Sequence, residues 1–136
     1  MPIPKLNLMN ARRLLFLIGI ITLTACSSGK KAFEHGNYFE AVMLSVGRLR
    51  QNPDHSKSRE ALKNSYPLAL EGLQTDANNQ IASNSPSKWR NAIASYDKIN
   101  QMYETIRQSP GALKVIPNPK NFYNEMGPLK EKAADE

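Results

Sequence analysis

The sequence predicts an all-α fold, and two observations carry that prediction. Apolar residues recur at steps of three and four over two long stretches, which is the period of a helix that buries one face. Clusters of proline, glycine and serine at residues 53, 84–87 and 109–111 separate these stretches and are expected to end the helices. We therefore expect antiparallel helical hairpins, followed by an irregular segment and a short C-terminal helix.

The first hairpin is predicted over residues 33–52. Gly36 permits a tight turn between antiparallel helices, and Ala41 is small enough for two helices to approach closely. Pro53 is expected to end the second helix of this pair because proline has no backbone N–H to donate.

A long helix is predicted next, with Ser56 as its N-cap. Its apolar stripe consists of residues at helical spacing, namely Leu62, Tyr66, Ala69, Leu73, Ala77 and Ile81. Pro67 lies inside this stripe and either kinks the helix near Lys63 or divides it into two pieces. A kink is favoured, because the stripe stays in phase beyond the proline.

A strict heptad spacing predicts the following helix. The residues at this spacing are Trp89, Ala92, Tyr96, Ile99, Tyr103 and Ile106. Aromatic residues at such positions are expected in the core. Trp89 is the exception that we single out, because it lies near the tip of the second hairpin, where a half-exposed indole would serve as an anchor for a partner.

The C-terminal part is predicted to be less regular. Ser109, Pro110 and Gly111 end the heptad helix, and residues 112–116 are expected to be extended or irregular. Asn118 and Pro119 look like the cap and first turn of a last helix. Gly127 and Pro128 are expected to bend or interrupt this helix, and residues 130–136 to form a fraying tail.

The spacing of Gly36, Tyr38, Ala41 and Pro53 resembles that of a tetratricopeptide repeat. Residues 89–99 resemble the second helix of another such repeat, so that the resemblance covers residues 33 to about 107. It implies a tetratricopeptide-like stack of helical hairpins.

In a stack of this kind, the first helix of the second hairpin would line a concave surface with Lys57, Glu60 and Asn64. The family often uses such positions to grip an extended peptide or a terminal carboxylate. The resemblance thus implies partner binding at these three residues, and the alternative is a solvated helix face.

The N-terminus has the layout of a bacterial signal peptide. Three basic residues, Lys5, Arg12 and Arg13, precede an apolar run over residues 14–23. As a helix this run would be about 15 Å long, roughly half the hydrocarbon thickness of a bilayer. It therefore suits a cleaved leader better than a permanent membrane span.

The next residues, Leu23-Thr24-Ala25-Cys26, resemble the lipobox of bacterial lipoproteins. The resemblance implies cleavage between Ala25 and Cys26 and attachment of acyl chains, palmitate among them, to the Cys26 thiol. Two or three chains anchor a protein firmly, since each buried methylene contributes about 0.8 kcal/mol. The alternatives are an ordinary secretory leader with an incidental cysteine, or a small buried thiol.

The domain organisation follows from these assignments. Residues 1–25 form the signal peptide, residues 26–29 the lipidated cysteine and a short tether, and residues 30–136 the helical tetratricopeptide-like domain. Serine after the lipidated cysteine, as at Ser27, is associated in such lipoproteins with the outer membrane. The expected location is the inner leaflet of that membrane, facing the periplasm.

Charge and composition argue against several other functions. Three of the 18 basic residues lie in the leader, so the rest of the chain carries 15 against 12 acidic residues, which argues against nucleic-acid binding. His35 and His55 are isolated from other metal ligands, so we expect no metal. We expect no enzyme and no cofactor, because no nucleophile elbow or glycine-rich phosphate loop is present.

The expected function is a membrane-anchored adaptor that binds a protein partner in the cell envelope, during assembly, maintenance or secretion. The leading alternative is a structural or apolar-ligand-carrying envelope lipoprotein, and an unrecognised hydrolase ranks third. The residues expected at the partner site are Lys57, Glu60, Asn64 and Trp89.

Overall fold

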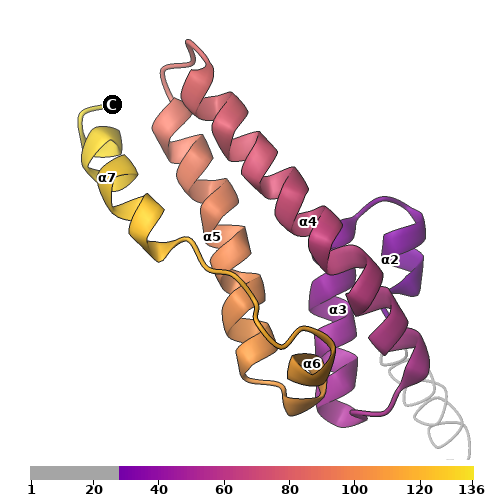
Figure 1. Ribbon diagram of the computed structural model, residues 1–136. Helices are drawn as coiled ribbons and strands as arrows, with labels where there is room; N and C mark the ends of the chain where they lie inside the picture. Colours follow the sequence, from indigo (N-terminus) through magenta and orange to yellow (C-terminus); the bar gives the residue numbers. More distant parts are fainter. Residues whose placement is uncertain (1–27) are drawn as a thin grey trace, which may run out of the picture.

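The computed structural model of the protein describes residues 28–136, and the regular structure of this part is entirely helical (Figure 1). Its helices are α2 (Lys30–Glu34), α3 (Tyr38–Gln51), α4 (Ser56–Ala82), α5 (Lys88–Arg107), α6 (Pro110–Val115) and α7 (Tyr123–Ala134). The predicted all-α fold is confirmed. The predicted signal peptide with Ala25, and the predicted lipidation site Cys26, lie outside the described residues.

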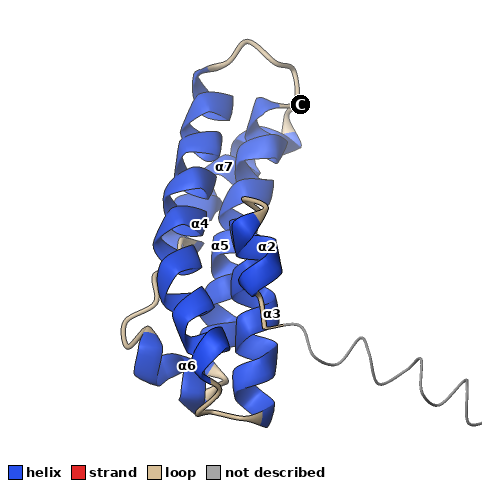
Figure 2. Ribbon diagram, turned by 90° about the vertical axis from the view of Figure 1, so that its right-hand side faces the viewer, coloured by secondary structure: helices blue, strands red, loops and turns tan. Residues whose placement is uncertain are grey.

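Helix α4 is the central element of the fold. It packs against α2, α3, α5 and α6, whereas α7 lies on the far side of α5 from α2 (Figure 1). Figure 2 shows α4 and α5 side by side along the height of the molecule, with α6 at the lower end. With 27 residues α4 is about 40 Å long, whereas the 14 residues of α3 span about 21 Å. Helix α3 therefore flanks only the N-terminal half of α4.

The core lies between α3, α4 and α5 and continues under α7. The larger side chains that are completely buried in it are Val42, Val46, Leu49, Leu62, Ile99, Met102 and Ile106. Of the aromatic residues predicted in the core, Tyr66 and Tyr96 are buried, but Tyr103 is only half-buried because the buried stripe of α5 runs through Met102 instead.

The local predictions for the first hairpin are confirmed. Gly36 has a φ of +78° in the turn between α2 and α3, Ala41 is completely buried, and α3 ends at Gln51, two residues before Pro53. Helix α4 passes through Pro67 without a break, so the less favoured alternative, a division into two helices, does not occur. The tetratricopeptide-like arrangement as a whole stays a prediction.

The cap of α4 differs from the prediction. Ser56 is the first helical residue, and the N-cap is His55, whose Nδ1 accepts a hydrogen bond from the backbone N–H of Ser58 at 3.3 Å. The Ser58 hydroxyl, which is buried, also lies 2.8 Å from this nitrogen. The imidazole nitrogen of His55 thus accepts the N-cap hydrogen bond that the Ser56 hydroxyl oxygen was expected to accept.

The C-terminal part is more regular than predicted. Residues 110–115 form α6, whose first turn holds Pro110 and whose N-cap, Ser109, accepts a hydrogen bond from the Ala112 N–H at 3.3 Å. Helix α7 begins at Tyr123, after Asn118 and Pro119, so these two residues do not start it. It then runs unbroken through Pro128 to Ala134, which replaces the predicted interruption and most of the fraying tail.

The segment between α6 and α7 is attached to α4 through Tyr66. The backbone N–H of Lys120 donates to the Tyr66 hydroxyl oxygen at 2.8 Å, and burial raises the pKa of Tyr66 above its usual 10.0. The hydroxyl is therefore part of the packing between two distant segments. No helix in the described residues is long and apolar enough to cross a bilayer.

Replacing Tyr66 by Phe should lower the free energy of unfolding by about 1–2 kcal/mol, because the Lys120 N–H loses its acceptor. The raised pKa means that the unfolded chain ionises first, so Tyr66 destabilises the fold as the pH rises above 10.0. Urea unfolding from neutral to high pH should show this fall in the native protein and a smaller one in the variant. Tyr103→Phe, at a half-buried position, is the control, and an equal pH slope in Tyr66→Phe would contradict the assignment.

Candidate functional site

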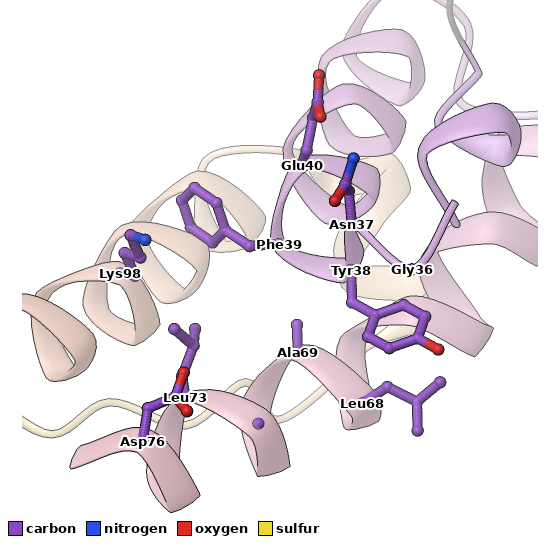
Figure 3. Close-up of a pocket in the computed structure, with 11 residues that line it drawn as sticks. Gly36, Asn37, Tyr38, Phe39, Glu40, Leu68, Ala69, Leu73, Asp76 and Lys98 are labelled. Atoms are coloured by element: carbon purple, nitrogen blue, oxygen red, sulfur yellow. The ribbon is translucent and has the colours of Figure 1, made fainter. Parts of the chain in front are cut away.

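An open groove of about 530 Å³ lies between α3, α4 and α5 and is here called the α4 groove (Figure 3). One wall is the turn before α3 and its first residues, the floor is the middle of α4, and Lys98 of α5 closes the far side. Its lining consists of Gly36, Asn37, Tyr38, Phe39, Glu40, Leu68, Ala69, Gly72, Leu73, Asp76 and Lys98.

The groove exists because α3 is short and α4 is long. Helix α3 begins at Tyr38, beside the middle of α4, so the next turns of α4 have no helix on this side. The floor there is low, since Ala69 has only a methyl group and Gly72 has no side chain, with open space where its Cβ would stand. Leu68 beside them is 38% exposed, one of two large hydrophobic residues exposed in the described part of the chain.

Charged groups stand at the edges of this apolar floor. Lys98 Nζ lies 5.7 Å from the ring centroid of Phe39, and Asp76 stands next to Leu73 on α4, whereas the Glu40 side chain points away from α4 (Figure 3). Asn37 makes no side-chain cap at the start of α3, so the amide N–H groups of the first turn are free to donate at the groove's edge. The arrangement suits a ligand with an apolar face and charges of both signs.

The lining of the α4 groove contains no serine, cysteine or histidine. Within residues 28–136, no three carboxylate, histidine or cysteine side chains come together as metal ligands. The lining residues offer a ligand apolar contact and charge pairing. His35 ends α2 and His55 caps α4, so both histidines of the chain lie at helix boundaries, as expected.

Three of the four predicted partner residues come together in the structure. Lys57, Glu60 and Asn64 line one pocket of about 150 Å³ between α2 and α4. Residues of α2 form its other side, where the chain has an ion pair between Lys30 Nζ and Glu34 Oε1 at 3.8 Å. Helix α2 therefore occupies much of the surface that was expected to receive a peptide.

Trp89 lies far from these three residues. Asn91 of α5 donates from Nδ2 to Gln80 Oε1 at 3.0 Å, so α5 starts beside the C-terminal end of α4. Gln80 is about 24 Å along the helix from Asn64. The structure therefore places Trp89 apart from Lys57, Glu60 and Asn64, because much of the length of α4 separates them, and partner binding by any of the four stays a prediction.

The indole of Trp89 also has partners of its own. The ammonium groups of Lys88 and Lys132 each lie 4.6 Å from the ring centroid. The Trp89 backbone N–H donates to Glu136 Oε1 at 2.9 Å, and Glu136 Oε2 lies 3.5 Å from Arg90 Nε. The end of α7 thus lies beside Trp89, which is half-buried, as expected for an indole near the tip of the hairpin; its role as a partner anchor stays a prediction.

Another hollow, of about 360 Å³, lies beside α5 and contains Met43, Asp97, Asn100 and Tyr123. The Tyr123 hydroxyl donates to Glu104 Oε1 at 2.8 Å, and this hydrogen bond is the main reason that the pKa of Tyr123 is raised. The tyrosine and the carboxylate satisfy each other here, which makes this hollow a weaker candidate than the α4 groove.

The α4 groove was missed in the sequence. Its floor residues Ala69 and Leu73 belong to the predicted apolar stripe, so they were assigned to the core. The available signal was the difference in length between the first hairpin and the helix after it, which leaves the C-terminal turns of α4 without α3 beside them. The chain matches no protein-family model, no curated protein and no solved structure.

Proposed function

We propose that the protein is a lipid-anchored adaptor of the bacterial cell envelope, which holds a segment of a partner protein in the α4 groove close to a membrane. Cys26 is the proposed lipidation site, and the inner leaflet of the outer membrane, facing the periplasm, is the proposed location. The observation that carries this proposal is the fixed start of the domain, two residues after Cys26.

The chain is fixed to α3 at Ser28 and Gly29. The Ser45 hydroxyl donates to the Ser28 carbonyl oxygen at 3.0 Å, and Gly29 is buried with a φ of +81°. The Gly29 carbonyl oxygen then accepts from the Phe33 N–H at 3.0 Å, in the first turn of α2. Two extended residues reach at most about 7 Å, so acyl chains on Cys26 would keep this contact next to the lipid.

An anchor this short favours an adaptor. A protein held at the membrane surface meets other membrane-bound proteins at a high effective concentration, so that a shallow groove suffices for binding. The α4 groove is open and carries charges of both signs, which suits a folded or extended protein segment better than a sequestered lipid.

Substitution of Cys26 by Ser tests the anchor. We expect the full-length variant to stay uncleaved and to incorporate no labelled palmitate, whereas the native chain incorporates it and fractionates with membranes. Label on the Cys26→Ser protein, or a mature native chain with a free thiol in the soluble fraction, would refute the proposed lipidation.

A matched pair of glycines tests the groove. Gly72 and Gly47 are both exposed helical glycines, and at each the place where a Cβ would stand has no other atom within 4 Å, but only Gly72 lines the groove. With a photo-reactive residue at Leu68, we expect cross-links to a defined envelope protein, lost in Gly72→Trp and kept in Gly47→Trp.

The same experiment separates the alternatives. Cross-links from probes at Lys57 or Trp89 to that protein, with none from Leu68, would move the partner site away from the groove. A native protein that co-purifies with a stoichiometric lipid and cross-links to no protein would instead support the apolar-ligand carrier.

A further inference from the structure

One end of the helical domain is strongly basic, and this feature is separate from the α4 groove. The last turns of α3, α5 and α6 and the first turns of α4 meet there (Figure 1). Two contacts hold this end together: Arg50 Nη2 donates to the Thr105 carbonyl oxygen at 3.3 Å, and Gly111 of α6 packs on Pro53. The basic residues of this end are Arg48, Arg50, Lys57, Arg59, Arg107 and Lys114.

The positive charge of this basic end exceeds what its helix ends require. Asp54, Glu60 and Glu104, which lies in the last turn of α5, oppose the six basic side chains there. Three helix C-termini and one N-terminus together contribute about one negative charge, which leaves a net charge of about +2. Five of the six basic residues are exposed, all except Arg48. Most of this charge is therefore free to act on a partner.

The opposite end of the molecule is different. It holds Lys88, Arg90, Lys130 and Lys132 together with Glu131, Asp135 and Glu136, so its charges are nearly balanced. Glu136 Oε2 also lies 3.5 Å from Arg90 Nε, and Lys88 and Lys132 sit over the Trp89 ring. Both ends thus contain several lysine and arginine residues, but the basic end has the larger net positive charge.

The chain start lies near the basic end. Ser45, which holds Ser28, is six residues before the end of α3, or about 9 Å along the helix. Lys30 and Lys57 line the same pocket, so the first residues after the tether adjoin the first turns of α4. The opposite end of the molecule lies at the other end of α4, about 40 Å from the basic end. An anchor at Cys26 puts the basic end within reach of the bilayer, and the charge of that end then decides whether it rests on the headgroups.

We propose that the basic end, together with Lys30 and Lys31, rests on anionic phospholipid headgroups, so that the domain stands upright on the membrane. This inference rests on the proposed lipid anchor. Lysine and arginine close to an anionic surface attract it within about one Debye length, roughly 8 Å at physiological salt. Upright, the domain holds the α4 groove about 22 Å above the headgroups, the distance along α4 from Lys57 to Gly72.

The test compares two exposed serines at opposite ends of the full-length, processed protein. Ser56→Cys places a fluorescent label at the basic end, and Ser87→Cys places one at the opposite end. Each protein is reconstituted into vesicles of phosphatidylcholine with phosphatidylglycerol, or of phosphatidylcholine alone, with a nitroxide quencher on the headgroups. We expect quenching at position 56 in the phosphatidylglycerol vesicles, and its loss in about 1 M salt, where the Debye length is about 3 Å.

Charge reversal supplies matched variants. Lys57→Glu with Arg59→Glu should abolish the quenching at position 56, and Lys88→Glu with Arg90→Glu should leave it unchanged, both with native helical circular dichroism. Equal quenching at positions 56 and 87 overturns the upright orientation. So does quenching at position 56 that is the same with and without phosphatidylglycerol, or that stays the same after Lys57 and Arg59 are reversed in charge. A mass without acyl chains and a protein that fails to float with vesicles would instead refute the anchor itself.

Discussion

Replacing Asn100 by Ala is expected to lower the free energy of unfolding by about 2–4 kcal/mol, because one buried amide connects α7 to the rest of the fold. Asn100 is 3% exposed, its Oδ1 accepts from the Phe122 N–H at 2.6 Å, and its Nδ2 donates to Met126 Sδ at 2.9 Å. Alanine would leave the Phe122 N–H without its acceptor and a cavity beside Met126.

The loss should be concentrated in α7. The other contacts of this helix lie nearer the surface or are apolar: Phe122 stacks on Tyr96 with ring centroids 5.2 Å apart, Met126 and Leu129 are buried, and exposed hydrogen bonds join Tyr123 to Glu104 and Glu136 to Trp89. Amide hydrogen exchange should therefore quicken over residues 123–134 in the variant while α3 and α4 stay protected.

Gln101→Ala is the control for Asn100→Ala. It removes an exposed hydrogen bond to Asp97 Oδ2 from the same helix, so a change below about 0.5 kcal/mol is expected. Unchanged exchange in α7 of Asn100→Ala would show that Phe122 and Met126 are held by other means.

The second large effect is expected from Gly29→Ala, which should destabilise the protein by about 3 kcal/mol or release α2 from α3. A Cβ at Gly29 would overlap the Ser45 Oγ and lie 2.5 Å from the Ala41 carbonyl oxygen. In addition, the φ of +81° costs a residue with a side chain about 1–2 kcal/mol. The steric overlap adds roughly 1–3 kcal/mol, as overpacking does elsewhere.

Two other glycines separate these causes. Gly36 has a similar φ of +78° but nothing within 4 Å of a Cβ, so Gly36→Ala should cost only the backbone strain, about 1–2 kcal/mol. Gly47 lies in α3 with negative φ and open space, so Gly47→Ala should stabilise by about 0.5–1 kcal/mol. Thermal unfolding of the three variants gives the comparison, and equal losses at Gly29 and Gly36 would exclude the steric term.

Helical periodicity predicted the long elements of the fold well. The two stripes correspond to α4 and α5, and the breaks at Pro53 and at residues 84–87 separate helices in the structure. These elements are long enough for their buried faces to dominate over local preferences. The fold class follows from them.

The C-terminal part was harder to predict, because its sequence signals are local capping residues and prolines. Ser109 and Pro110 were interpreted as the end of one helix, yet serine followed by proline is also a good start, and α6 begins there. Asn118 and Pro119 carry a similar signal where no helix starts, because the segment is held by the hydrogen bond from Lys120 to Tyr66 instead. Local capping preferences do not decide between these outcomes, whereas tertiary contacts do.

The candidate site was only partly predictable. The tetratricopeptide resemblance implied Lys57, Glu60 and Asn64 as one group, and the structure brings them together in one pocket. The surroundings of Trp89 depend on where α7 ends, and the existence of the α4 groove depends on the relative lengths of α3 and α4 in space. Neither is encoded in a short window of sequence.

The central position of α4 has a kinetic consequence. Its largest partners, α3 and α5, are also its neighbours in the chain, so most of the core forms by closing short loops, whose entropy cost is small. Helical proteins with such local topology collapse to the native state in microseconds to milliseconds. A polypeptide that is delivered unfolded across a membrane would thus spend little time exposed to proteases before its centre is assembled, and α7, tied to α5 from a distance in sequence, would dock last.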